Sequence, residues 1–82
     1  MIEGSLYVFS LPRGADKATV SEAIEKALEA TSAGRVLGSG TSIADGGTVA
    51  VDIGAYDRDA AHYAISRACR RLKCWDFEVA WD

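Results

Sequence analysis

Apolar residues alternate with polar or small ones over residues 48–56 (TVAVDIGAY). The apolar positions of this segment are Val49, Val51, Ile53 and Ala55. A period of two is typical of a β-strand that buries one face, so we predict a strand here. The upstream residues Asp45, Gly46 and Gly47 tolerate positive φ, and residues 35–56 are therefore predicted to form a β-hairpin.

The first strand of that hairpin, residues 35–43, is rich in glycine. Alternation places Gly38 and Gly40 on one side of the strand. The residues on the other side are Leu37, Thr41 and Ile43. Because glycine weakens a strand and often marks a bulge or a close backbone approach, we expect this strand at the edge of the sheet.

Two further segments are predicted as strands. Residues 5–11 (SLYVFSL) are apolar on both faces, with Leu6 and Val8 on one and Tyr7 and Phe9 on the other, which is typical of a central strand. Residues 75–81 again have a period of two. Their apolar positions are Trp75, Phe77, Val79 and Trp81.

The first helix is predicted to begin at Thr19, because Thr19 and Glu22 have the spacing of a capping box. Its apolar stripe has helical spacing and consists of Val20, Ala23, Ile24, Ala27 and Leu28. The opposite face carries Glu22, Glu25, Lys26 and Glu29. The helix is predicted to end at Ala33-Gly34, since glycine suits the left-handed position after a helix.

The second helix is predicted to follow an N-cap at either Asp57 or Asp59. Its buried stripe is predicted to be Ala61, Ala64, Ile65, Ala68 and Leu72. Basic residues gather near its C-terminal end, where the helix dipole favours positive charge. They are Arg67, Arg70, Arg71 and Lys73.

The predicted order of elements is β-α-β-β-α-β over a single domain of residues 1–82. Right-handed crossovers then place both helices on one face of a four-stranded antiparallel sheet. This is the ferredoxin-like α+β arrangement, with the first and third strands at the centre of the sheet.

Composition narrows the function classes. The chain is 49% hydrophobic and 26% charged, with a net charge of −3. Its acidity argues against nucleic-acid binding, which usually requires a basic face, and is compatible with a basic partner. No apolar run reaches the roughly 18 residues that span a bilayer, and MIEGSLYVF has no basic region typical of a signal peptide. With only two cysteines, we expect a reduced, cytoplasmic protein.

The sequence offers little candidate chemistry. The glycine-rich segment GRVLGSGTS lacks the lysine of a phosphate-binding loop and precedes no helix. His62 has no predicted nucleophile partner, and Cys69 and Cys74 are five residues apart, which does not fit a redox pair or a zinc site. Asp57 and Asp59 are explained as caps. We therefore predict no enzyme activity, metal or cofactor.

Candidate binding surfaces follow from the topology, because helices on one side leave the other face of the sheet open. If Val51 and its neighbours face the helices, Ala50 and Asp52 lie on the open face, beside either Tyr7 and Phe9 or Leu6 and Val8. Open faces with aromatic residues bind RNA in some domains. Here Asp52 would repel phosphate, so a protein partner or a second copy is the expected cover.

Two other surfaces are candidates for the same role. The edge strand with Gly38 and Gly40 is open to strand addition by a partner. The acidic face of the first helix, formed by Glu22, Glu25 and Glu29, is the other. The charges of the two helices either pair across the groove between them or remain solvated, and a further alternative is an anion or acidic-partner site on the second helix.

The segment GRVLGSGTSIADGGTVAVDI, followed by an Asp-rich turn and an Ala-rich helix, resembles small bacterial ferredoxin-like proteins. The resemblance covers residues 35–72. Some proteins of this sort are immunity proteins for toxins or phage-borne inhibitors of bacterial defence. The resemblance therefore implies a small module that inhibits a protein partner, and it carries over no catalytic residue.

Three function classes remain open at this point. The first is a non-catalytic binding or inhibitor module that covers a partner's functional surface. The second is a homodimeric, ligand-sensing domain similar to ACT domains, with a ligand held by the loop of residues 12–18. The third is a small enzyme of the acylphosphatase or dimeric α+β-barrel type. For an acylphosphatase-like site Arg13 is present, but the asparagine expected on the third strand is missing. We favour the first class.

Overall fold

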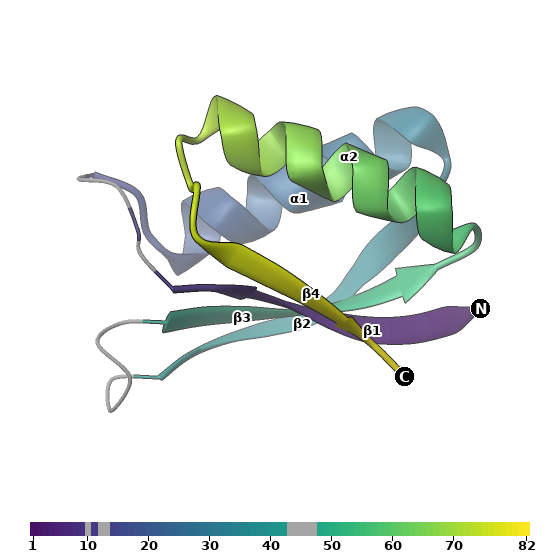
Figure 1. Cartoon of the computed structure of the whole chain (residues 1–82), viewed down its shortest axis with the longest axis horizontal. Helices are drawn as coiled ribbons and strands as arrows, with labels where there is room; N and C mark the ends of the chain where they lie inside the picture. Colours follow the sequence, from purple (N-terminus) through teal and green to yellow (C-terminus); the bar gives the residue numbers. More distant parts are fainter. Residues whose placement is uncertain (10, 12–13, 43–47) are drawn as a thin grey trace.

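The alternating strand predicted from the sequence lies at the centre of a four-stranded sheet (Figure 1). A computed structural model of the chain describes residues 1–9, 11, 14–42 and 48–82. Its elements, in chain order, are β1 (Ile2–Val8), α1 (Lys17–Thr31), β2 (Gly34–Ser42), β3 (Thr48–Ala55), α2 (Arg58–Arg71) and β4 (Phe77–Trp81).

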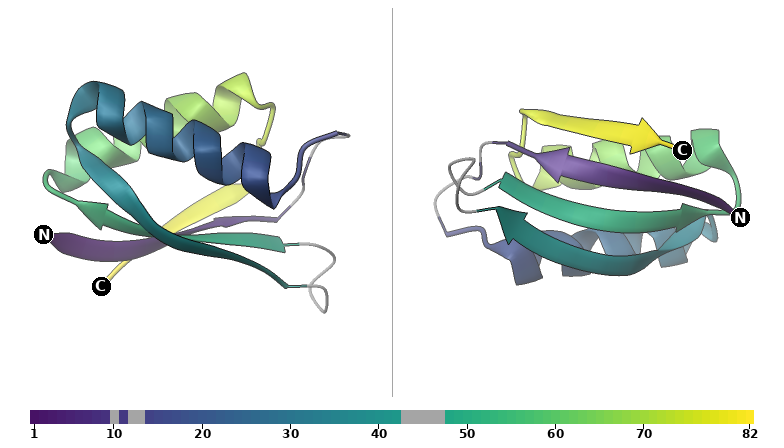
Figure 2. Two further views of the ribbon diagram at one scale, coloured as in Figure 1. Left: turned by 180° about the vertical axis from the view of Figure 1, so that it is seen from behind. Right: turned by 90° about the horizontal axis from the view of Figure 1, so that it is seen from below.

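The strand order is β2-β3-β1-β4, and every neighbouring pair is antiparallel. Both helices lie on the same face of the sheet, side by side and running in opposite directions (Figures 1 and 2). The right-hand view of Figure 2 shows the uncovered face, with β2 and β4 at its edges. These findings confirm the ferredoxin-like α+β fold and the edge position of the glycine-rich strand.

The core is one apolar layer between the sheet and the helices. Alternate residues of β3 fill its centre, since Val49, Val51, Ile53 and Ala55 are all buried as predicted. Leu6 and Val8 of β1 are also fully buried, which leaves Tyr7 on the open side. The helices contribute Val20, Ile24, Leu28, Ala61, Ala64, Ile65, Ala68 and Cys69.

The first and last strands of the chain differ in length from the predictions. β1 begins at Ile2 rather than at residue 5, because its residues pair with β3 from Ile2 opposite Ala55 to Val8 opposite Val49. β1 ends at Val8 rather than at residue 11. Beyond it, the Phe9 N–H donates a last hydrogen bond to the Asp76 carbonyl at 2.9 Å. Trp75, predicted in the last strand, precedes β4 and is 70% exposed.

The N-terminus of α1 corrects the predicted capping box. Asp16 is the N-cap, and its Oδ1 accepts hydrogen bonds from the Thr19 backbone N–H and hydroxyl, each at 2.8 Å. Thr19 is therefore inside the first turn rather than ahead of it. The two bonds from Thr19 favour the charged carboxylate and lower the pKa of Asp16. At α2, Asp57 is the N-cap, and Asp59 lies in the first turn.

The end of α1 also differs from the prediction. Ser32, with φ of 54°, takes the left-handed position that we assigned to glycine, and its N–H bonds back to the Glu29 and Leu28 carbonyls. Gly34 is instead the first residue of β2. There it lies against the Gly54 carbonyl oxygen, which a Cβ at this position would overlap. The glycine is thus required by a close approach of two strands.

A β-bulge in β2 changes which residues face the helices. Val36 pairs with Ile53, but Gly38 pairs with Asp52, so Leu37 and Gly38 together oppose one residue of β3. Leu37, in the bulge, is 42% exposed. Val36 packs against the core instead. Ile43 and the predicted Asp45-Gly46-Gly47 turn lie outside the described residues.

Two glycines of β2 provide a matched test of the close approach. We expect Gly34→Ala to lower the free energy of unfolding by about 1–3 kcal/mol, because the added Cβ would overlap the backbone of β3. Gly38→Ala is the control, since its Cβ would lie 3.7 Å from the Asp52 carboxylate, an ordinary contact. Urea unfolding of both variants checks this, and equal stabilities would contradict it.

Candidate protein-binding surface

The uncovered face of the sheet is organised in rows that run across the strands. One row, read from β2 to β4, is Gly38, Asp52, Ser5 and Ala80. The next row is Gly40, Ala50, Tyr7 and Glu78. Residues opposite each other in antiparallel strands share a face of the sheet. The register therefore brings the candidate residues Tyr7, Gly38, Gly40 and Asp52 together.

Asp52 lies near the middle of this face because it is on a central strand. Its carboxylate is exposed and accepts a hydrogen bond from the Ser5 hydroxyl at 3.1 Å. Its neighbours in the row carry small side chains or none, so nothing large stands beside it. The position offers a partner an accessible carboxylate that is held in place by one neighbour.

The aromatic part of the surface is a ring pair formed by Tyr7 and Phe9. The ring centroids are 6.4 Å apart, and the ring planes are inclined by 20°, which is a stacked arrangement. Tyr7 is half-buried and Phe9 is 40% exposed. Both candidates therefore lie together, although Phe9 is just beyond the end of β1.

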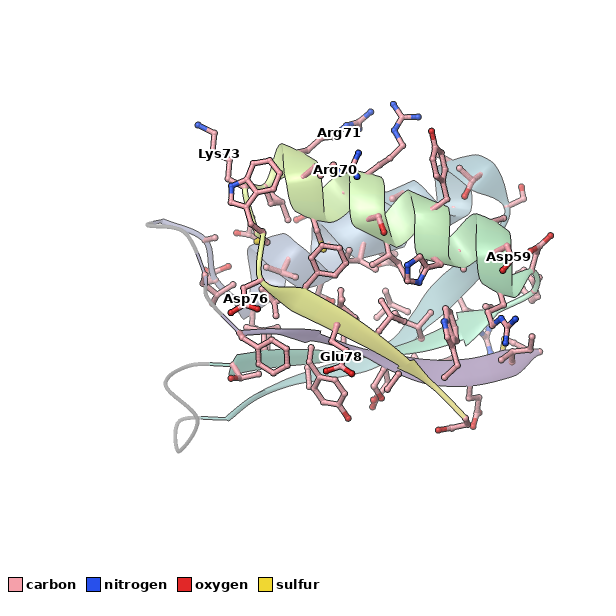
Figure 3. The ribbon with its side chains drawn as sticks, viewed as in Figure 1. Asp59, Arg70, Arg71, Lys73, Asp76 and Glu78 are labelled. Atoms are coloured by element: carbon pink, nitrogen blue, oxygen red, sulfur yellow. The ribbon has the colours of Figure 1, made fainter. Side chains whose placement is uncertain are left out.

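Charge on the open face is mainly negative. Glu78 is exposed next to Tyr7 in the register and lies on the side of β4 away from the helices (Figure 3). Glu3 and Arg35 flank Gly54 in a third row. Within the part of the chain that the structure describes, Glu3, Asp52 and Glu78 form no ion pair. Their carboxylates are thus available to a basic partner.

The acidic face of α1 is separate from this surface. Glu22, Glu25 and Glu29 are exposed on a helix of the opposite layer, so the core lies between them and Asp52. Glu22 forms an ion pair with Lys26 at 3.0 Å, one turn along the same helix. An exposed pair of this kind contributes little to stability. The predicted sites therefore split into two surfaces, of which only the sheet face also carries stacked aromatic rings.

The basic cluster lies at the end of α2, on the helix side of the molecule. Arg70, Arg71 and Lys73 are seen there in Figure 3, far from Glu78. Arg67 lies over the Tyr63 ring, with its guanidinium carbon 5.7 Å from the ring centroid. Of the two alternatives for the helix charges, pairing across the groove is not seen among the described residues, where each ion pair lies within one helix.

Sequence reasoning missed Glu78 and Ser5 as members of the surface. Glu78 alternates with partly buried apolar residues of β4, so the sequence showed which face it occupies but not that β4 lies beside β1 next to Tyr7. Ser5 was treated as the first residue of a strand, whereas it is central and holds Asp52. Strand register, which the sequence did not determine, is the missing information in both cases.

The remaining reactive side chains do not assemble into a site. His62 is exposed on α2, and Cys69 and Cys74 are free thiols within the core. Burial, with a smaller effect of Cys74, raises the pKa of Cys69 to about 12, and burial also raises the pKa of Cys74. Among the described residues, no group of three or more His, Cys, Asp or Glu side chains could hold a metal ion.

Comparisons with known proteins found no match to the chain among family models, curated proteins or solved structures. No helix within the described ranges is long and apolar enough to cross a membrane.

The buried thiols lead to a prediction about reactivity. At pH 8 both cysteines are expected to remain protonated and covered, so the folded protein should react with iodoacetamide far more slowly than the urea-unfolded chain. Mass spectrometry of quenched samples measures the extent of alkylation. Rapid labelling of either cysteine in the folded protein would contradict this account of the core.

The raised pKa of Cys69 also predicts that the stability of the fold depends on pH. Between about pH 9 and 12 the unfolded chain loses the Cys69 proton and the folded chain keeps it, so stability should fall as the pH rises through this range. Cys69→Ala removes that titration and should flatten this part of the curve, even if the variant is less stable at pH 7. The prediction is contradicted if the stabilities of the parent and of Cys69→Ala fall equally steeply between about pH 9 and 12.

Proposed function

We propose that this protein is a small, non-catalytic binding module that inhibits a protein partner by covering a basic surface of it with the open sheet face. The observation that carries the proposal is the convergence of Tyr7, Phe9, Asp52 and Glu78 on that face. Strands β1, β3 and β4 supply Tyr7, Asp52 and Glu78, and Phe9 directly follows β1, so the sheet presents them together. Immunity proteins and inhibitors of bacterial defence are the class of role that fits such a module.

The chemistry of the face supports a protein partner of positive charge. The stacked rings provide apolar area at low cost in conformational entropy, and the surrounding carboxylates can pair with arginine or lysine. An arginine from a partner could stack on an aromatic ring and bond to Asp52 at the same time. Buried free thiols are consistent with action in the reducing cytoplasm.

The face also argues for binding rather than catalysis. Its acidic groups Asp52 and Glu78 are exposed carboxylates, whereas a catalytic site usually places titratable groups in a concave, partly desolvated pocket. Inhibition by steric cover requires neither a nucleophile nor a bound metal.

The test compares two charge reversals that alter net charge equally. We expect Asp52→Arg to weaken binding of the principal partner at least about tenfold, since it replaces a charge-assisted contact by repulsion in the interface. Glu25→Arg, exposed on α1 in the opposite layer, is the matched control and should bind as the parent does. The partner is first captured from host lysate with the tagged parent and identified by mass spectrometry, and affinities then follow from calorimetry.

Thermal unfolding of both variants establishes that they are folded. Equal affinity of parent and Asp52→Arg for the same partner would rule out the open face as the interface. If Glu25→Arg alone lost binding, the acidic face of α1 would be the interface instead. Light scattering of the free protein adds a further check, because a dimer that buries Tyr7 would leave the face unavailable.

A further inference from the structure

A groove lies between the two helices, on the side of the molecule away from the sheet. It has a volume of about 530 Å³ and is lined mainly by alanines of both helices. The alanines and other apolar residues of its floor and walls are Ala23, Ala27, Ala30, Ala64, Ala68 and Leu72. Small side chains on facing helices leave this space open along the line where the helices meet.

Cationic side chains from both helices border the groove. Lys26 of α1 and both Arg67 and Arg71 of α2 line it. Arg71 is the last residue of α2. Arg67 is engaged with the Tyr63 ring, and Lys26 with Glu22. In the part of the chain that the structure describes, Arg71 forms no ion pair.

Arg71 is repelled by a neighbouring positive charge, and a bound anion would offset this repulsion. Arg67 and Arg71 are four residues apart on one helix face, where like charges repel each other. The C-terminal dipole of α2 offsets part of that repulsion. A carboxylate or phosphate oxygen between Lys26 and Arg71 would receive charge-assisted hydrogen bonds from both sides of the groove.

We propose that this groove binds a small amphipathic anion, with its charged head between Lys26 and Arg71 and its apolar body along the alanines. The groove is the place where apolar surface meets cationic side chains of both helices. The proposal concerns a different surface from the open sheet face and does not rest on the proposed function.

The dimensions favour a small molecule over a docked helix. The lining residues run from Ala23 to Thr31 and from Ala64 to Leu72. Eight steps of the helical rise correspond to about 12 Å of groove. A volume near 530 Å³ lies within the range of small-molecule sites, about 300–1,000 Å³. A specific protein interface usually buries more than about 1,000 Å², well beyond two helical turns. An extended chain advances about 1.2 Å per bond, so the body of decanoate matches the groove in length.

Decanoate, kept below its micelle concentration, is therefore the probe. We expect saturable shifts in ¹H–¹⁵N NMR spectra at Ala27, Ala64 and Ala68, with small changes at Tyr7 and Asp52 on the opposite face. Arg71→Glu should weaken binding about tenfold, because it removes a charge-assisted contact and adds repulsion. Arg70→Glu makes the same charge change one residue away, outside the lining of the groove, and should bind nearly as the parent does.

Two further measurements separate the apolar and ionic parts of the site. Ala30→Leu fills the groove from an exposed helix position and should abolish binding without disturbing the core. 1-Decanol, which lacks the charge, should bind more weakly than decanoate. The proposal is overturned if decanoate leaves the groove amides unshifted, if Arg70→Glu and Arg71→Glu weaken binding equally, or if 1-decanol binds as well. Shifts produced only by an acidic amphipathic peptide would identify a helix as the occupant and would equally overturn it.

Discussion

One layer of apolar side chains between sheet and helices determines most of this structure. A domain of 82 residues has room for a single core, and here the apolar residues of the core face the same two helices. The alternation in β3 therefore fixes the orientation of the whole sheet. Once Val49, Val51 and Ile53 face the helices, antiparallel pairing forces Leu6 and Val8 to the same side, and Tyr7 and Asp52 to the other. The candidate surface is a consequence of that single constraint.

Periodicity explains why so much of the fold could be predicted. Alternation in β3 and the helical spacing of Val20, Ile24 and Leu28 are repeated signals, and several residues agree on each face. The predictions failed for features that depend on a single residue, such as a helix cap or one glycine. Asp16 was missed as a cap because Thr19 and Glu22 offered a competing motif. Gly34 was assigned to a helix end because its true reason, the carbonyl of Gly54, comes from a strand distant in sequence.

The candidate site shows the same division between local and distant information. Tyr7, Asp52 and the glycines of β2 were predicted to share a face, since alternation along each strand gives that directly. Their grouping into rows with Ser5 and Glu78 depends on register, and the bulge at Leu37 moves part of β2 by one residue. A bulge is a property of two paired strands, so no pattern within β2 alone identifies it. The helix groove likewise requires knowledge of how two separate helices meet.

The two proposed surfaces lie on opposite sides of the core and carry opposite charge, which limits how they can influence each other. A partner on the sheet face and an anion in the helix groove share no residue, so each can bind without excluding the other. Long-range attraction between them is weak, because exposed charges separated by more than about 10 Å are largely screened at physiological salt. Coupling would require the helices to shift against β3, and the tightly packed Val51 and Ile65 resist such movement. The geometry thus favours two independent binding events on one rigid scaffold, and occupation of the groove should leave the affinity of the sheet face unchanged.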